Sequence, residues 1–102
     1  MFGKLAEAQK KSEEIKAKLS SILVNGEDSL HWVTISMDAN KIIREVQISE
    51  ICMHPENKKR LEDAIKEALS NALAAADNVS QSEMKNLLGS MLPGMGNLFG
   101  KG

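Results

Sequence analysis

The chain has 102 residues, a length that suits one domain, and a formal net charge of −1. This charge excludes a general electrostatic attraction to nucleic acid, so any such contact has to come from one face of the molecule. The only aromatic residues, Phe2, Trp32 and Phe99, are too few for the stacking platforms that bind single strands or RNA loops. Because Cys52 is the only cysteine and no apolar run approaches the roughly 20 residues of a membrane span, we expect a cytoplasmic protein without membrane contact.

The first part of the chain is expected to form a helix as far as residue 22. Small or apolar residues recur there at steps of three and four, the spacing of a heptad seam: Leu5, Ala8, Ser12, Ile15, Leu19 and Ile22. Two arrangements remain open. The helix packs its seam on the sheet of its own chain, or it projects and meets a second copy.

Short strands are expected next. Leu23 and Val24 suit a short strand before a turn at residues 25–29, and residues 30–37 alternate between apolar and polar as a half-buried strand does. The inward face of that strand would carry Val33, Ile35 and Met37. After a hairpin turn at residues 38–41, a further strand would place three residues on one face, interrupted by Arg44: Ile42, Val46 and Ile48. The resulting sheet is antiparallel and small.

A long second helix is expected from Pro55, which suits a first helical turn, to about Val79. Residues 80–83 (Ser-Gln-Ser-Glu) resemble a capping box, which favours a separate short helix after it. Five of the seven glycines follow Leu88, so we expect a folded domain over residues 1–88 and a flexible Gly/Met-rich tail over residues 89–102. The fold class is therefore α+β. Its sheet leaves faces and edges that a partner chain could cover.

The sequence contains no convincing constellation for catalysis, metal or cofactor binding. Cys52 and His54 form the only Cys/His cluster, and two ligands fall short of a tetrahedral zinc set, so packing is the favoured role for both. The Gly94-x-Gly96 pair neither follows a strand nor opens a long helix, which excludes a phosphate loop. We expect a protein that is not an enzyme.

Two groups of cations are candidates for contacts with the DNA backbone. The first helix carries Lys4, Lys10, Lys11, Lys16 and Lys18, and its length of about 33 Å is close to one turn of B-DNA. From the pattern alone a solvated salt ladder is favoured there, because Glu7 and Glu14 precede Lys11 and Lys18 by four residues. The second group is Lys58, Lys59 and Arg60, where cations oppose the helix dipole and either hold a phosphate or belong to a mixed-charge surface.

Several stretches, in order along the chain, resemble one known family. They are the opening residues 1–11 (MFGKLAEAQKK), Val24-Asn25-Gly26-Glu27 followed by Val33-Thr34-Ile35, Leu61-Glu62-Asp63-Ala64, and the tail motifs Leu92-Pro93-Gly94-Met95-Gly96 and Leu98-Phe99-Gly100-Lys101. In these the chain is similar to the YbaB/EbfC nucleoid-associated family. It departs from the family at residues 28–32 (Asp-Ser-Leu-His-Trp), which replace a glycine-rich run, and at residues 49–55.

This resemblance implies an α-β-β-β-α homodimer that binds duplex DNA with low sequence specificity, organises the nucleoid and influences gene expression. The residues expected at the dimer interface are Leu5, Ala8, Ile15, Leu19, Ile22 and Trp32. Without the resemblance, the net charge favours an alternative, a small dimeric protein-interaction module such as a chaperone or adaptor. Because Met is adaptable, the Met-rich tail is a candidate site for a protein partner in either case.

Overall fold

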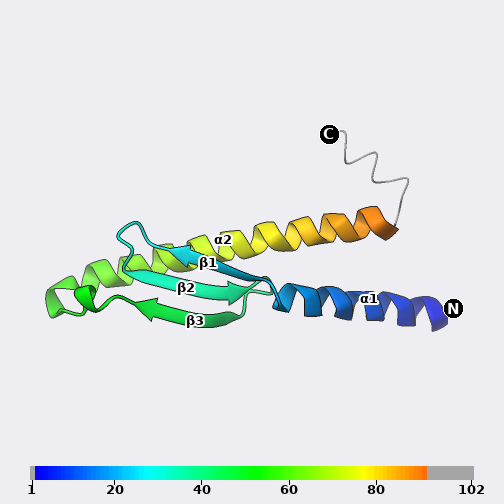
Figure 1. Cartoon of the computed structure of the whole chain (residues 1–102), viewed down its shortest axis with the longest axis horizontal. Helices are drawn as coiled ribbons and strands as arrows, with labels where there is room; N and C mark the ends of the chain where they lie inside the picture. The colour runs from blue at the N-terminus through cyan, green and yellow to red at the C-terminus, as the bar shows by residue number, and fades with distance from the viewer. Residues whose placement is uncertain (1, 92–102) are drawn as a thin grey trace.

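The computed structural model describes residues 2–91 and shows one α-helix, three strands and a second, long α-helix (Figure 1). The elements are α1 (Phe2–Ser20), β1 (Leu23–Glu27), β2 (Val33–Asp38), β3 (Ile43–Ile48) and α2 (Lys58–Met91), with the single-turn helices η1 (Glu50–Cys52) and η2 (Pro55–Asn57) between β3 and α2. The strands form one antiparallel sheet in the order β1-β2-β3. The expected α-β-β-β-α fold with a projecting N-terminal helix is confirmed.

Helix α2 packs closely on β1 and β2 because small residues meet at the contact. Its buried ridge consists of alanines at every fourth position: Ala64, Ala68, Ala72 and Ala76. Opposite this ridge lies Gly26, where a Cβ atom would overlap backbone atoms of Ala68 and Ala72. The turn expected at residues 25–29 is therefore wrong in part. Residues 25–27 continue β1, because Gly26 serves helix–sheet contact and not chain reversal.

The remaining core comes from the alternation of β2. Val33, Ile35 and Met37 point toward α2 and are buried, as expected from the sequence. The strand itself begins only at Val33, since residues 28–32 form the loop from β1.

A bulge explains why Arg44 interrupts the apolar pattern of β3. Ser36 pairs with Glu45 and Met37 pairs with Ile43, so Arg44 is an extra residue that the register skips. The residue beside Val46 and Ile48 on the inward face is consequently Ile43 and not Ile42 as expected. The hairpin turn at residues 38–41 is confirmed, with Lys41 at a positive φ of 70°.

The two helices differ from their expected bounds. Helix α1 ends at Ser20, and Ile22 lies in the connection to β1. Helix α2 runs without a break to Met91, so the separate short helix expected at Ser80 is wrong. No Gly or Pro occurs between Lys58 and Leu88, and an N-capping signal does not end a helix that nothing interrupts. Helix α2 includes the first three residues of the expected tail, and residues 92–102 lie outside the described part of the chain.

Candidate nucleic-acid interface

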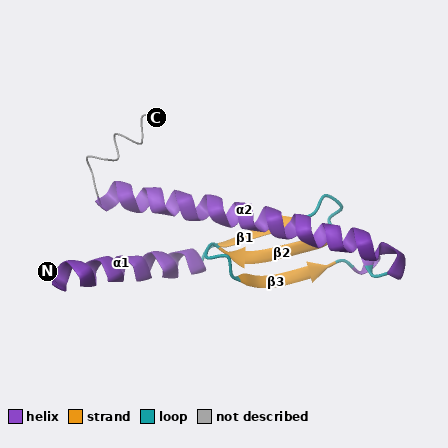
Figure 2. Ribbon diagram, turned by 180° about the vertical axis from the view of Figure 1, so that it is seen from behind, coloured by secondary structure: helices purple, strands orange, loops and turns teal. Residues whose placement is uncertain are grey.

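Helix α1 extends away from the sheet and exposes most of its surface (Figures 1 and 2). Residues 6–14 are all exposed, while Ile15 is half-buried and Leu19 is buried. The helix therefore contacts the rest of its chain mainly through its last turns. The side chains of Lys4 and Leu5 lie outside the described part.

The cations of α1 do not share one face. At about 100° per residue, Lys11 and Lys18 fall on one side of the helix, whereas Lys10 and Lys16 point in two other directions. All four side chains are exposed. A duplex lying along α1 would therefore meet only part of this set.

One side of α1 faces the second half of α2 across a shallow, open groove. The Nζ atom of Lys18 lies 2.8 Å from Oε2 of Glu83, so Lys18 pairs with α2 and not with Glu14, the partner expected from spacing. The groove is lined by residues of both helices: Lys11, Glu14, Ile15, Lys18, Glu83, Asn86 and Leu87. With acids and bases mixed along it, the groove is not a one-sided phosphate channel.

The second cation group lies at the other end of the chain, at the start of α2. Lys58, Lys59 and Arg60 are exposed, and Lys59 pairs with Asp63 at 3.4 Å. Along α2, Lys59 is about 36 Å from Glu83, the residue that contacts Lys18. A single chain therefore does not bring the two cation groups together.

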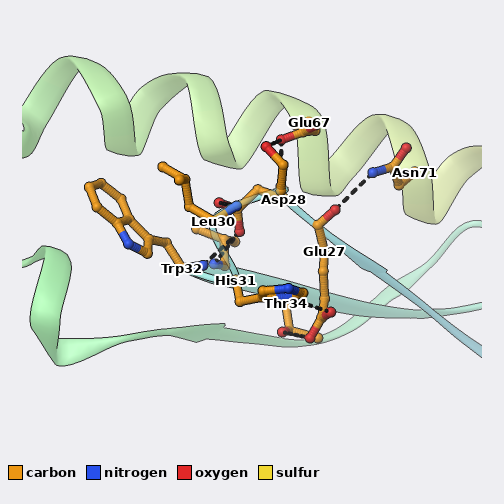
Figure 3. Close-up of polar contacts among 10 residues, drawn as sticks. Glu27, Asp28, Leu30, His31, Trp32, Thr34, Glu67 and Asn71 are labelled. Atoms are coloured by element: carbon orange, nitrogen blue, oxygen red, sulfur yellow. Dashed lines mark hydrogen bonds and ion pairs between the residues drawn. The ribbon is translucent and has the colours of Figure 1, made fainter.

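The β1–β2 loop is held tightly, and Figure 3 shows how. The buried carboxylate of Asp28 accepts hydrogen bonds from the backbone N–H groups of Leu30, Trp32 and Val33 at 2.8–3.1 Å. Burial raises the pKa of Asp28, but these hydrogen bonds outweigh it and hold the pKa below its ordinary value. His31 takes the positive φ of 59° in this loop, a conformation that glycine would adopt more easily.

Helix α2 also fastens this loop and its strand. Glu67 accepts hydrogen bonds from the backbone N–H and the hydroxyl of Ser29, and Asn71 donates to the backbone carbonyl of Glu27 (Figure 3). Trp32 is half-buried and packs against the core. The side of α2 that carries Glu67 and Asn71 therefore faces β1.

The opposite side of α2, toward β3, is only partly covered: Leu61, Leu69 and Leu73 are half-buried against the core and Ile65 is 37% exposed. Its ridge of Leu61, Ile65, Leu69 and Leu73 continues to Asp77, which pairs with Lys41 in the β2–β3 turn. The inward residues of the neighbouring strand β3, which α2 does not cover, remain 41–50% exposed: Ile43, Val46 and Ile48. We call these seven apolar residues the apolar trough.

The apolar trough was not expected as a site, although its signal was present in the alternation of the last strand. Three strands span roughly 14 Å at about 4.8 Å each, whereas a helix is about 10 Å across. One helix placed over β1 and β2 cannot cover β3 as well, and α2 has few contacts with that strand. Exposed apolar surfaces on a sheet are characteristic of interaction sites.

The residues expected at the dimer interface are distributed over several environments. Leu19 is buried inside its own chain, Ile15, Ile22 and Trp32 are half-buried, and Ala8 is exposed. Within residues 2–91, no group of three or more His, Cys, Asp or Glu side chains is placed to hold a metal ion. No helix of that part is long and apolar enough to cross a membrane.

The fold and this surface define a class: a small α+β protein with a projecting, cation-bearing helix and an uncovered apolar face on its sheet. The sequence profile of the YbaB/EbfC DNA-binding family matches residues 1–91, and the chain belongs to this family.

Relatives and a solved structure agree with this assignment. The chain is 33% identical to a nucleoid-associated protein of Rhodopseudomonas palustris, over 94% of this chain and 93% of the relative. It is 32% identical to one of Afipia carboxidovorans (94% and 92% covered) and 29% identical to one of Flavobacterium johnsoniae (97% and 94%). A crystal structure of an uncharacterized Helicobacter pylori protein has the same fold, with a TM-score of 0.74 at 18% identity, covering 85% of this chain and 91% of that one.

Proposed function

We propose that this protein is a cytoplasmic, nucleoid-associated protein that binds duplex DNA as a homodimer, organises the nucleoid and influences gene expression. The observation that carries the proposal is the projecting helix α1, whose residues 6–14 are exposed throughout and whose cations from Lys10 to Lys18 all reach solvent. Its relatives' names and its family agree with DNA as the ligand.

Binding would use phosphates and not base edges. The cations proposed to contact the backbone are Lys4, Lys10, Lys11, Lys16, Lys18, Lys58, Lys59 and Arg60. Sequence readout in the major groove relies on Arg, Asn and Gln aimed at base edges, and α1 offers Gln9 alone of these. Low sequence specificity follows.

The dimer would form through the apolar trough. Each copy presents the apolar Leu61–Leu73 side of α2 next to the exposed inward residues of β3, so the helix of one copy would cover the β3 strand of the other. A two-fold axis parallel to α2 would cover both β3 strands at once, with the two α2 helices side by side between two sheets. An axis perpendicular to the sheet would join the β3 edges but leave the inward residues of both strands exposed.

This arrangement has a consequence for DNA binding. An axis parallel to α2 makes both α1 helices project in the same direction, as a pair of arms that can engage one duplex. Leu5, Ala8 and Ile15 remain candidates for contacts between the arms, and Ile22 and Trp32 for contacts nearer the sheets. Leu19 contributes through its own chain by fixing the base of α1. The cations Lys58, Lys59 and Arg60 of both copies lie together at the opposite end.

The salt dependence of duplex binding tests the proposal. The log of the affinity should fall linearly with log salt, with a slope of roughly −0.9 for each phosphate contact. Lys10→Ala combined with Lys11→Ala should reduce the slope by up to about 2 per protomer and weaken all duplex sequences alike. Lys58→Ala with Lys59→Ala tests the second group by the same two measurements, duplex affinity and salt slope. Circular dichroism checks that each variant is folded.

The matched control is Lys66→Ala with Lys85→Ala, which removes as many exposed cations from α2 outside both groups. If the Lys10/Lys11 variant and the Lys58/Lys59 variant both leave duplex affinity and salt slope unchanged, these cations do not touch DNA. A wild-type protein that binds no duplex at low salt would refute the proposed function.

A protein-interaction module is the second candidate, favoured by the outer face of the sheet. That face carries Glu27 and Glu45 among mostly polar residues, and the one cation of the strands, Arg44, pairs with the buried Asp38. Such a face suits a basic protein partner better than DNA. The tail from residue 89 onward would be a further site for such a partner. Loss of protein capture on deleting residues 92–102, with duplex affinity retained, would assign that role to the tail.

A further inference from the structure

The base of α1 is held by one short segment, the turn between β2 and β3. Helix C-termini leave backbone carbonyls without partners inside the helix. Here the amide of Asn40 donates to the carbonyl of Lys16 at 2.9 Å, and the backbone N–H of Ala39 donates to the carbonyl of Leu19 at 3.0 Å. Arg44 reaches the carbonyl of Ser20 at 3.4 Å. The carbonyls of Leu19 and Ser20, two of the four without an i+4 partner, are thus bonded by the β2–β3 turn and by Arg44 of β3, and the turn also reaches Lys16, just before them.

That turn is itself rigid, because a buried carboxylate organises it. Asp38 is fully buried and accepts hydrogen bonds from the backbone N–H groups of Asn40 and Ile42 at 2.9 and 3.1 Å. It also pairs with Arg44 through Nε and Nη2 at 3.2 and 2.8 Å. Arg44 can reach both Asp38 and Ser20 because the bulge in β3 leaves it outside the regular pairing.

The turn is also tied to α2, through the ion pair of Lys41 with Asp77. Helix α1 itself meets α2 through the Lys18–Glu83 ion pair, whose lysine is largely exposed. Although the Glu83 side chain is only 19% exposed, a single ion pair to a largely exposed, flexible lysine contributes little to holding a helix in one direction. The direction of α1 therefore depends on the turn more than on α2.

We infer that the β2–β3 turn, together with Arg44 beside it, anchors the end of α1 and so fixes the direction of this DNA-binding arm. Asn40 and Arg44 are the positioning residues. This inference rests on the proposed function, in that α1 is taken to touch DNA. A fixed arm loses less freedom when it binds, so a looser arm should bind the same phosphates more weakly.

The prediction separates positioning from direct contact. Asn40→Ala removes the bond to Lys16 and keeps the backbone hydrogen bond to Asp38. Arg44→Lys keeps a cation beside Asp38 but lacks the second N–H group that reaches Ser20. Each should weaken duplex binding roughly two- to tenfold, since a net hydrogen bond is the interaction lost. The salt slope should stay at the wild-type value, because no phosphate contact is removed.

Arm direction can be measured directly, in the absence of DNA. Spin labels at Gln9→Cys on α1 and Gln81→Cys on α2, in a Cys52→Ser background, report the distance between arm and helix. Mixing with an excess of unlabelled chain restricts the signal to one protomer. Asn40→Ala and Arg44→Lys should broaden this distance distribution. Asn71→Ala is the matched control, because it removes an amide-to-carbonyl hydrogen bond of 2.8 Å between α2 and β1.

The outcomes are distinct. The inference is supported if Asn40→Ala and Arg44→Lys broaden the distances and weaken duplex binding with an unchanged salt slope, while Asn71→Ala does neither. Unchanged distances in both turn variants overturn it, and so do broadened distances with unchanged affinity. If the wild type binds no duplex, the proposed function fails, and the link from arm direction to affinity fails with it. The distances then still show whether the turn fixes the arm.

Discussion

The sheet end of the molecule and the α1 end differ in how their residues are held. Around the sheet, a glycine, an alanine ridge and two buried carboxylates leave almost no tolerance for change. Along α1, residues 6–14 are exposed and only the last turns are anchored. The difference indicates that stability resides at the sheet end, while the larger of the two proposed groups of DNA-contacting cations lies on α1. Substitutions should therefore affect folding or binding, and few should affect both.

The largest effect on stability is expected at Gly26. A Cβ atom there would overlap the backbone of α2, and neither element can move without separating helix from sheet. Gly26→Ala should lower the free energy of unfolding by about 3 kcal/mol or more, measured by denaturant titration. Gly89→Ala is the control, because an added Cβ atom would meet nothing within 4 Å, and it should be neutral or slightly stabilising. Equal effects of the two substitutions would contradict the close packing of α2 on β1.

The next effect concerns the apolar trough. Val46→Asp places a charge at the centre of the proposed dimer interface and should convert a particle of twice 11.1 kDa into one of 11.1 kDa in light scattering. Gln47→Asp, on the outer face of the same strand, should leave the mass unchanged. A wild-type chain that is already monomeric at micromolar concentration would refute the proposed dimer.

A smaller effect is expected on acidification. Asp28 and Asp38 both have pKa values lowered in the folded state: burial raises them, and hydrogen bonds to each carboxylate, with Arg44 at Asp38, lower them by more. Each carboxylate thus contributes stability that is complete above its ordinary pKa of about 4 and is lost as the pH falls through the lowered folded value. The midpoint of urea unfolding should drop below about pH 4, and Asp28→Asn should flatten that dependence. A Glu62→Gln variant, changed at an exposed carboxylate, should retain it.

The smallest effect is expected at His31, at the tip of the tightly held β1–β2 loop. Its positive φ costs a side chain more than it costs glycine, so His31→Gly should raise the free energy of unfolding by up to about 1 kcal/mol. Thermal melting measures this change. Duplex affinity should not change, because His31 belongs to neither group of cations proposed to contact phosphates.

Much of the fold could be predicted from the sequence because it depends on local patterns. The period of α1, the alternation of β2 and the hairpin turn after it all follow from neighbouring residues. The errors have long-range causes, with one exception. Gly26 is a turn residue by type, but its role is set by Ala68 and Ala72, far along the chain. The exception is the continuation of α2 past Ser80, which the absence of Gly and Pro indicates more strongly than the capping motif indicates a break.

The candidate site was less predictable. The cations could be named from composition, but their division between two ends of the molecule depends on the length of α2. The apolar trough depends on how many strands one helix can cover. The contact of Asn40 and Arg44 with the end of α1 joins residues 24 positions apart and has no signal in the local sequence.

Under the proposed dimer, the uncovered inward face of β3 would also make the stability of the protein depend on its own concentration. A chain that buries this face only against another copy gains folding free energy by mass action, so its melting temperature should rise with concentration. At low copy number, the same strand is an exposed apolar edge, open to proteolysis and to pairing with unrelated chains. For the proposed DNA-binding dimer, this would couple persistence to abundance: a large pool of the protein would be durable and a small one short-lived.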